Sequence, residues 1–205
     1  MKPKRIILVR HGECDANIDE NKFATIPDYT IELTPKGYEQ ALEAGKKLKR
    51  IVKEETLYFY VSPFWRTRST FEAIVKAFPR EQFHYSEEPR LREQEWGYLR
   101  TEQELQQLKL QRREYGIFYY RFPGGEAGSD VYDRINDLLG SLHRDFTTDS
   151  YPENCILITH SETMQSPENG SLVILELNPE TNKYRLITPL ETKKEKPRYN
   201  RPIKI

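Results

Sequence analysis

The sequence is short of the features that mark secreted, membrane-spanning and nucleic-acid-binding proteins. Its 205 residues include two cysteines, too few for a disulfide framework, so we expect a reducing, cytoplasmic environment. The 32 basic and 32 acidic side chains cancel, so no overall charge favours nucleic acid or an anionic membrane as a partner. No apolar run approaches the length of a membrane span, and the N-terminal residues lead directly into an apolar strand. We therefore expect neither a membrane span nor a signal peptide.

Metal-binding patterns are scarce as well. The acidic residues and the four histidines lack ligand spacing, and we expect His84 and His143 to lie at the surface. The sequence therefore predicts no metal and no cofactor. Cys14 has no second cysteine or dedicated base near it in the sequence, so we interpret it as a packing residue rather than a nucleophile.

Apolar segments alternate with amphipathic ones along the chain. This alternation is typical of an α/β fold, and we expect a three-layer α/β/α sandwich with a mostly parallel sheet. We expect strands at residues 6–9, 57–61, 155–159, 171–177 and 184–187, the last two as a hairpin. We expect helices at residues 35–53, 64–78 and 102–115, and one more that Ser129 or Asp130 caps and that ends near Phe146. Residues 15–30 are polar, and we expect them to be irregular.

Two of the apolar strands end in a histidine. Residues 6–9 run into Arg10, His11 and Gly12, and residues 155–159 run into His160. The first stretch, taken alone, fits an ordinary strand end as well as a ligand site. The carboxyl ends of parallel strands meet at one edge of a sheet, so we expect the two imidazoles to lie close together.

A third strand delivers a further cation to the same edge. Residues 57–61 lead into a helix whose start contains Arg66, and helix N-termini and guanidinium groups both favour an anion. Two imidazoles, two guanidinium groups and backbone donors suit a phosphate dianion. The sequence therefore predicts a phosphate site at this sheet edge.

These stretches together resemble the histidine phosphatase superfamily, in its phosphoglycerate mutase-like branch. The matching residues are LVRHGE (8–13) with Asn17, Ser62-Pro63 with Arg66, LRE (91–93) with Gly97, PGGE (123–126) and ITH (158–160). The runs YRFPGGE (120–126) and PENGS (167–171) resemble in particular a fungal and plant subgroup of broad-range acid phosphatases.

The resemblance implies a role for each matching residue. His11 would attack phosphorus in line and form a phosphohistidine, while Arg10, Arg66 and His160 hold the phosphoryl oxygens. Glu93 would give a proton to the leaving oxygen and later activate water, with Glu95 as the competing candidate. The remaining residues implied in substrate binding are Asn17, Gly12, Ser161, Arg121 and Glu126.

The implied activity is metal-independent hydrolysis of a small-molecule phosphomonoester, of the broad-range acid phosphatase type. A phosphoglycerate mutase or sugar bisphosphatase is the alternative, for which Arg100, Arg112 and Arg121 are candidate ligands of a second phosphate. A catalytically weakened phospholigand-binding or interaction module is the alternative from another class. The residues leave the oligomeric state open.

We expect one domain over residues 1–190 and a charged, solvated tail over residues 191–205. Residues 98–128 form an insert near the predicted site and include an aromatic patch from Tyr115 to Phe122. The patch fits two interpretations equally, an apolar wall around the leaving group or packing beneath the insert's helix.

The sequence also departs from the family pattern. Cys14 stands where serine or threonine is common, and Ser161 stands where glycine usually follows the second histidine. Only six residues separate His160 from Pro167, where the family has a long helix. Because a parallel crossover needs about a dozen residues or more, we expect residues to be missing between about Gln165 and Ser166.

Overall fold

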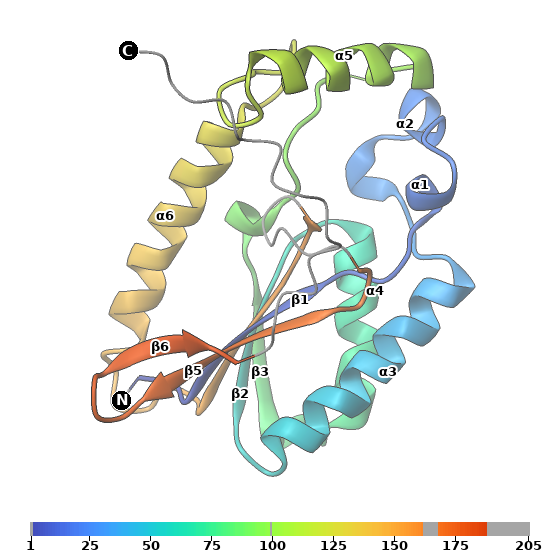
Figure 1. The fold of residues 1–205 in the computed structure, drawn as a ribbon. Coiled ribbons are helices and arrows are strands. Elements are labelled where there is room, and N and C mark those ends of the chain that lie inside the picture. Colours follow the sequence, from blue (N-terminus) through green and yellow to red (C-terminus); the bar gives the residue numbers. More distant parts are fainter. Residues whose placement is uncertain (1, 99, 162–167, 188–205) are drawn as a thin grey trace, which may run out of the picture.

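A six-stranded sheet in the order β3-β2-β4-β1-β5-β6 forms the centre of the molecule (Figure 1). The structure is a computed structural model and describes residues 2–98, 100–161 and 168–187. The strands are β1 (Arg5–Arg10), β2 (Leu57–Val61), β3 (Phe83–Glu87), β4 (Asn154–Thr159), β5 (Leu172–Asn178) and β6 (Lys183–Leu186). The pairs β1–β4, β2–β4 and β2–β3 are parallel, whereas β5 is antiparallel to both β1 and β6.

Helices cover both faces of this sheet. The α-helices are α1 (Asp15–Ile18), α2 (Lys22–Thr25), α3 (Pro35–Val52), α4 (Trp65–Ile74), α5 (Glu102–Tyr115) and α6 (Gly128–Asp145). The 3-10 turns are η1 (Asp28–Thr30), η2 (Val75–Ala77), η3 (Arg80–Gln82) and η4 (Pro89–Leu91). Figure 1 shows α3 and α4 on one side of the sheet, α6 on the other, and α5 crossing between α2 and the start of α6. The predicted three-layer sandwich is confirmed.

Alternation along β1 explains the layers, because successive strand side chains point to opposite faces of a sheet. Ile7 and Val9 join a buried cluster with residues of α3 and α4. Ile6 and Leu8 pack instead against a cluster that includes Leu138 of α6. β1 therefore contributes side chains to both hydrophobic clusters, and this packing fixes its carboxyl end at Arg10.

Three predicted elements need correction. Residues 83–87 were not expected to form a strand, and only Phe83 of β3 is buried because β3 lies at the edge of the sheet. Residues 15–30 are not irregular but form the short helices α1, α2 and η1. The N-cap of α6 is Ala127 rather than Ser129 or Asp130, since the Asp130 carboxylate accepts a hydrogen bond from the Ala127 amide at 2.8 Å.

The direction of β5 removes the reason for expecting missing residues. β5 runs antiparallel to β1, so the chain leaves β4 and enters β5 at the same edge, and no crossover is required. The Gly170 amide donates to the His11 carbonyl, and the Arg10 amide donates to the Ser171 carbonyl, each at 3.1 Å. The Gln165–Ser166 junction and the predicted tail over 191–205 lie outside the described residues.

Within the described part of the chain, no helix combines the length and apolar composition that a bilayer span requires. The same residues contain no group of three or more acidic, histidine or cysteine side chains placed to hold a metal ion.

Candidate active site

His11 follows β1 and is 3% exposed. Its Nδ1 lies 2.7 Å from the Gly12 carbonyl oxygen. Because a carbonyl can only accept, Nδ1 carries the proton and Nε2 keeps its lone pair. Burial, and then the charges of Arg66 and Arg10, hold the pKa of His11 well below its usual 6.5. The imidazole is therefore neutral even in mildly acidic solution.

His160 follows β4 and faces His11, with 5.2 Å between the ring centroids. Its Nε2 lies 2.8 Å from Ser62 Oγ, and its Nδ1 lies 3.9 Å from Glu93 Oε2. Nδ1 is buried without a hydrogen-bond partner among the described residues. Burial and the charge of Arg66 hold the pKa of His160 well below its usual 6.5. The structure thus brings the two imidazoles together at one sheet edge.

Arg66 lies in the first turn of α4 and is 3% exposed. Its Nη1 donates to the Asp28 carbonyl at 2.7 Å and to Asp28 Oδ1 at 2.9 Å. The guanidinium also lies over the Phe64 ring, 4.9 Å from the centroid. These contacts fix the cation beside His11. Arg10 is the last residue of β1 and directly precedes His11 in the sequence. It is 8% exposed.

Glu93 lies in the segment between η4 and α5. Its Oε1 accepts a hydrogen bond from the Gln94 amide at 3.1 Å, and Oε2 faces His160. Glu95 lies two residues farther along, and burial, with the nearby Asp28 charge, raises the pKa of its carboxyl. Both carboxyl groups border the cavity described next.

A cavity of about 630 Å³ opens in front of His11. The predicted site residues that line it are Arg10, His11, Asn17, Arg66, Glu93 and Ser161. Its apolar wall consists of Ala16, Phe23, Ile26, Pro27, Tyr29, Phe64, Trp96, Tyr98 and Leu105. The aromatic patch at Tyr115–Phe122 does not form this wall, and Phe122 instead stacks on Trp96 with 4.8 Å between centroids. The packing interpretation therefore applies to Phe122, which is buried, whereas Tyr115, Phe118 and Tyr119 are exposed.

Asn17 borders the cavity in α1. Its Oδ1 accepts hydrogen bonds from the Cys14 amide at 3.0 Å and from Asn169 Nδ2 at 2.8 Å. The oxygen is therefore occupied, and the amide NH₂ remains to donate to an anion. Cys14 is 3% exposed, and burial raises the pKa of its thiol, which fits packing rather than nucleophilic attack.

Three predicted substrate-binding residues are placed away from the cavity. Gly12 donates its amide to Thr70 Oγ1 at 3.1 Å, and a Cβ there would lie 2.1 Å from the Gly37 carbonyl oxygen, so this glycine admits α3. Arg121 is exposed and pairs with Asp130. Glu126 is partly buried among arginines, as described below.

Sequence reasoning missed Asp28, the partner of Arg66, and Arg134, which contacts the Glu93 backbone. Nothing in the sequence singles out Asp28. Arg134 does carry a signal, because it lies three residues after Val131 and four before Leu138, on the apolar stripe of α6. A charged side chain on a core-facing stripe requires buried partners.

The sequence is similar to those of known proteins. A sequence profile of the histidine phosphatase superfamily (branch 1) matches residues 6–186. Phosphoglycerate mutase-like protein AT74H from Arabidopsis thaliana is 40% identical over 179 residues, which are 80% of this chain and 64% of the relative. Broad-range acid phosphatase DET1 from Saccharomyces cerevisiae is 24% identical over 300 residues, covering 92% of this chain and 90% of the relative.

Solved structures share the fold. A mycobacterial glucosyl-3-phosphoglycerate phosphatase with VO3 has a TM-score of 0.66 and 20% identity, over 90% of this chain and 98% of that one. A putative alpha-ribazole-5'-P phosphatase from Escherichia coli has a TM-score of 0.65 and 18% identity, over 91% and 97%. This chain spans 64% of AT74H and 55% of its Arabidopsis relative AT74. From the profile match and this identity, the chain belongs to branch 1 of the histidine phosphatase superfamily.

Proposed function

We propose that this protein hydrolyses phosphomonoesters through a phosphohistidine on His11. The observation that carries the proposal is a buried, neutral imidazole whose Nδ1–H is held by the Gly12 carbonyl, so that Nε2 is free to attack. Arg10 and Arg66 border the same cavity and supply positive charge for the phosphoryl group.

The reaction has two steps. His11 Nε2 bonds to phosphorus while the P–O bond to the alcohol breaks, and Glu93 gives its proton to the leaving oxygen. Water then attacks phosphorus with Glu93 as the base, the N–P bond breaks, and inorganic phosphate leaves. His160 donates to a phosphoryl oxygen from Nδ1 when the Ser62 hydroxyl donates to Nε2. Because Glu93 begins as the acid, we expect a higher rate at acidic than at neutral pH.

The rest of the cavity supports hydrolysis of a monoester with an apolar alcohol part over the mutase or bisphosphatase alternative. A second phosphate needs a second set of cations, but the three further cations that border the cavity are each held by other protein groups. Lys109 pairs with Glu20 at 2.7 Å, Arg100 donates to the Pro123 carbonyl at 2.6 Å, and Arg92 pairs with Glu126. The yeast relative, a broad-range acid phosphatase, supports the same choice.

Hydrolysis of p-nitrophenyl phosphate tests the proposal. We expect His11→Ala to abolish turnover and acid-labile ³²P labelling together, while His84→Ala, a change at an exposed histidine of β3, leaves both intact. Full labelling of His11→Ala would overturn the covalent route. Tight phosphate binding without turnover in the wild type would favour the binding-module alternative.

A second assay separates phosphatase from mutase and assigns the acid. Isomerisation of phosphoglycerate that depends on 2,3-bisphosphoglycerate would overturn the choice of phosphatase. The pH–rate profile should lose its acidic maximum in Glu93→Gln and keep it in Glu95→Gln. The reverse result would make Glu95 the proton donor.

A further inference from the structure

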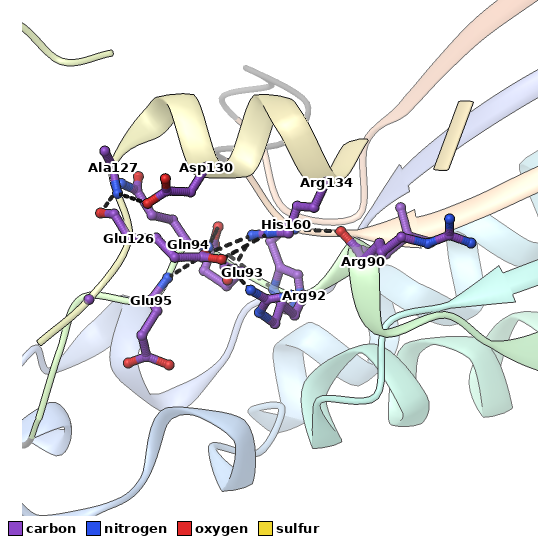
Figure 2. A network of polar contacts seen from close by, with 12 residues as sticks. Arg90, Arg92, Glu93, Gln94, Glu95, Glu126, Ala127, Asp130, Arg134 and His160 are labelled. Atoms are coloured by element: carbon purple, nitrogen blue, oxygen red, sulfur yellow. Dashed lines mark hydrogen bonds and ion pairs between the residues drawn. The ribbon is translucent and has the colours of Figure 1, made fainter. Parts of the chain in front are cut away.

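The segment that carries Glu93 is held by a partly buried arginine of α6, Arg134. Arg134 is 9% exposed at its side chain. Its Nη1 donates to the Arg90 carbonyl, and its Nη2 donates to the Glu93 carbonyl at 3.2 Å. Figure 2 shows Arg134 reaching from α6 to this segment. One guanidinium thus fixes the backbone on both sides of Leu91 and Arg92.

A partly buried carboxylate, that of Glu126, completes the attachment. Glu126 accepts hydrogen bonds from Arg134 Nε at 3.2 Å and Nη2 at 3.1 Å. The same carboxylate accepts from the Glu95 amide at 3.1 Å and pairs with the Arg92 side chain. Residues 90–95 are therefore attached at four points, two carbonyls, one amide and one side chain (Figure 2).

We infer that Arg134 and Glu126 are positioning residues that hold the Glu93 carboxyl at the leaving-group oxygen. Neither is among the described residues that line the cavity, so both act through the segment rather than on substrate. A misplacement of about 1 Å in a catalytic group can cost about 100-fold in rate. The inference rests on the proposed role of Glu93 as the proton donor.

A purely structural role for this ion pair makes a different prediction. Loss of stability alone lowers activity equally for all substrates, because it reduces the amount of folded enzyme. Loss of a positioned acid depends on the leaving group. A dinitrophenolate leaves without a proton, whereas an alkoxide needs one in the transition state.

The experiment compares kcat/KM of Arg134→Met for two substrates, 2,4-dinitrophenyl phosphate and β-glycerol phosphate. We expect a loss of about 100-fold with β-glycerol phosphate and less than about 3-fold with dinitrophenyl phosphate. Arg134→Lys, which keeps one donor, should recover part of the loss. Equal losses for both substrates would overturn the inference.

Two controls keep the outcomes distinct. Leu138→Ala, on the same helix and 1% exposed, should lower stability without any dependence on the leaving group. Glu93→Gln should show the leaving-group dependence in full. If Glu93→Gln affects both substrates equally, the proposed role of Glu93 as the proton donor fails, whereas selectivity in Glu93→Gln but not in Arg134→Met defeats only the positioning inference. If Arg134→Met does not fold, Glu126→Gln replaces it. We expect Glu126→Gln to show the same dependence on the leaving group with a smaller loss of kcat/KM. Equal losses of kcat/KM for both substrates would overturn the inference.

Discussion

Ser62 lies beneath His160 and is fully buried, as is the imidazole. Its Oγ is 2.8 Å from Nε2, so in the proposed reaction this hydrogen bond leaves Nδ1 of His160 to face the phosphoryl group. The Ser-Pro pair was recognised from the sequence, but its hydrogen bond to a residue 98 positions away comes from the parallel pairing of β2 with β4.

We expect Ser62→Ala to lower kcat about 10-fold and to leave KM little changed, because substrate contacts stay in place while His160 loses its orientation. The unpaired Nε2 should also cost about 1–3 kcal/mol of unfolding free energy. Steady-state kinetics and urea denaturation measure the two effects. Ser86→Ala on the edge strand β3 is the control. Unchanged kcat in Ser62→Ala would contradict the assigned orientation.

Gly12 lies in a motif that suggests ligand contact, but a glycine is required there for packing. A Cβ at Gly12 would lie 2.1 Å from the Gly37 carbonyl oxygen, and a Cβ at Gly37 would lie 1.9 Å from the Glu13 carbonyl oxygen. Both contacts are with backbone, which cannot rotate away.

We therefore expect Gly12→Ala and Gly37→Ala each to lower the unfolding free energy by about 2 kcal/mol or more, within the range of overpacking. Gly140→Ala is the matched control, since its added Cβ meets only the Arg144 side chain at 3.8 Å within α6. That change should stabilise the protein by about 0.5–1 kcal/mol. Chemical denaturation of all three variants checks the sign.

At the scale of elements, α5 connects the insert to the cavity. Leu105 and Lys109 border the cavity, and Lys109 pairs across its mouth with Glu20, which follows α1. Both side chains of the pair are about a third exposed, so the interaction is worth no more than about 1 kcal/mol.

We expect Lys109→Met to raise KM about 2- to 5-fold with kcat unchanged, because the pair orders the mouth and does not touch phosphorus. High salt should reduce the difference from the wild type, since exposed charges are screened. Arg113→Met, on the exposed side of α5, should change neither constant. A fall in kcat for Lys109→Met would place this lysine in the chemistry.

Most elements could be predicted because each has a local cause. Thr34 and Thr101 accept hydrogen bonds from the amides three residues later and begin α3 and α5, both close to the expected bounds. The orientation of β5 could not be predicted, because strand direction depends on pairing with the distant β1. The contacts of Arg66 with Asp28 and of Glu93 with Arg134 likewise join segments about 40 residues apart.

At the scale of the whole molecule, two buried neutral histidines couple the site to stability. Burial keeps the pKa values of His11 and His160 well below 6.5 in the folded state, whereas the unfolded chain titrates near 6.5. Below about pH 6.5 the unfolded state binds protons that the folded state does not. The free energy of unfolding therefore falls as the pH falls, by about 1.4 kcal/mol per pH unit for each histidine.

His160→Asn tests this linkage. Its unfolding free energy, measured by urea denaturation between pH 6 and pH 4.5, should fall less steeply than that of the wild type, by about 1.4 kcal/mol per unit. Parallel slopes would contradict the depressed pKa of His160. The acidic range that favours Glu93 as a proton donor is thus also the range in which the fold loses stability.

β4 ends at Thr159 and β5 begins at Leu172, and both points lie at the same edge of the sheet. Lengthening a connection whose two ends are fixed costs only about 0.6 kcal/mol of closure free energy for each doubling of its length. Residues can be added or removed here while the pairing of β1 with β4 and β5 stays in register. The alignment with DET1 extends over 300 positions, more than the 205 residues of this chain, so size variation exists among relatives. A change of length in this connection is therefore compatible with an unaltered strand edge at Arg10 and Thr159.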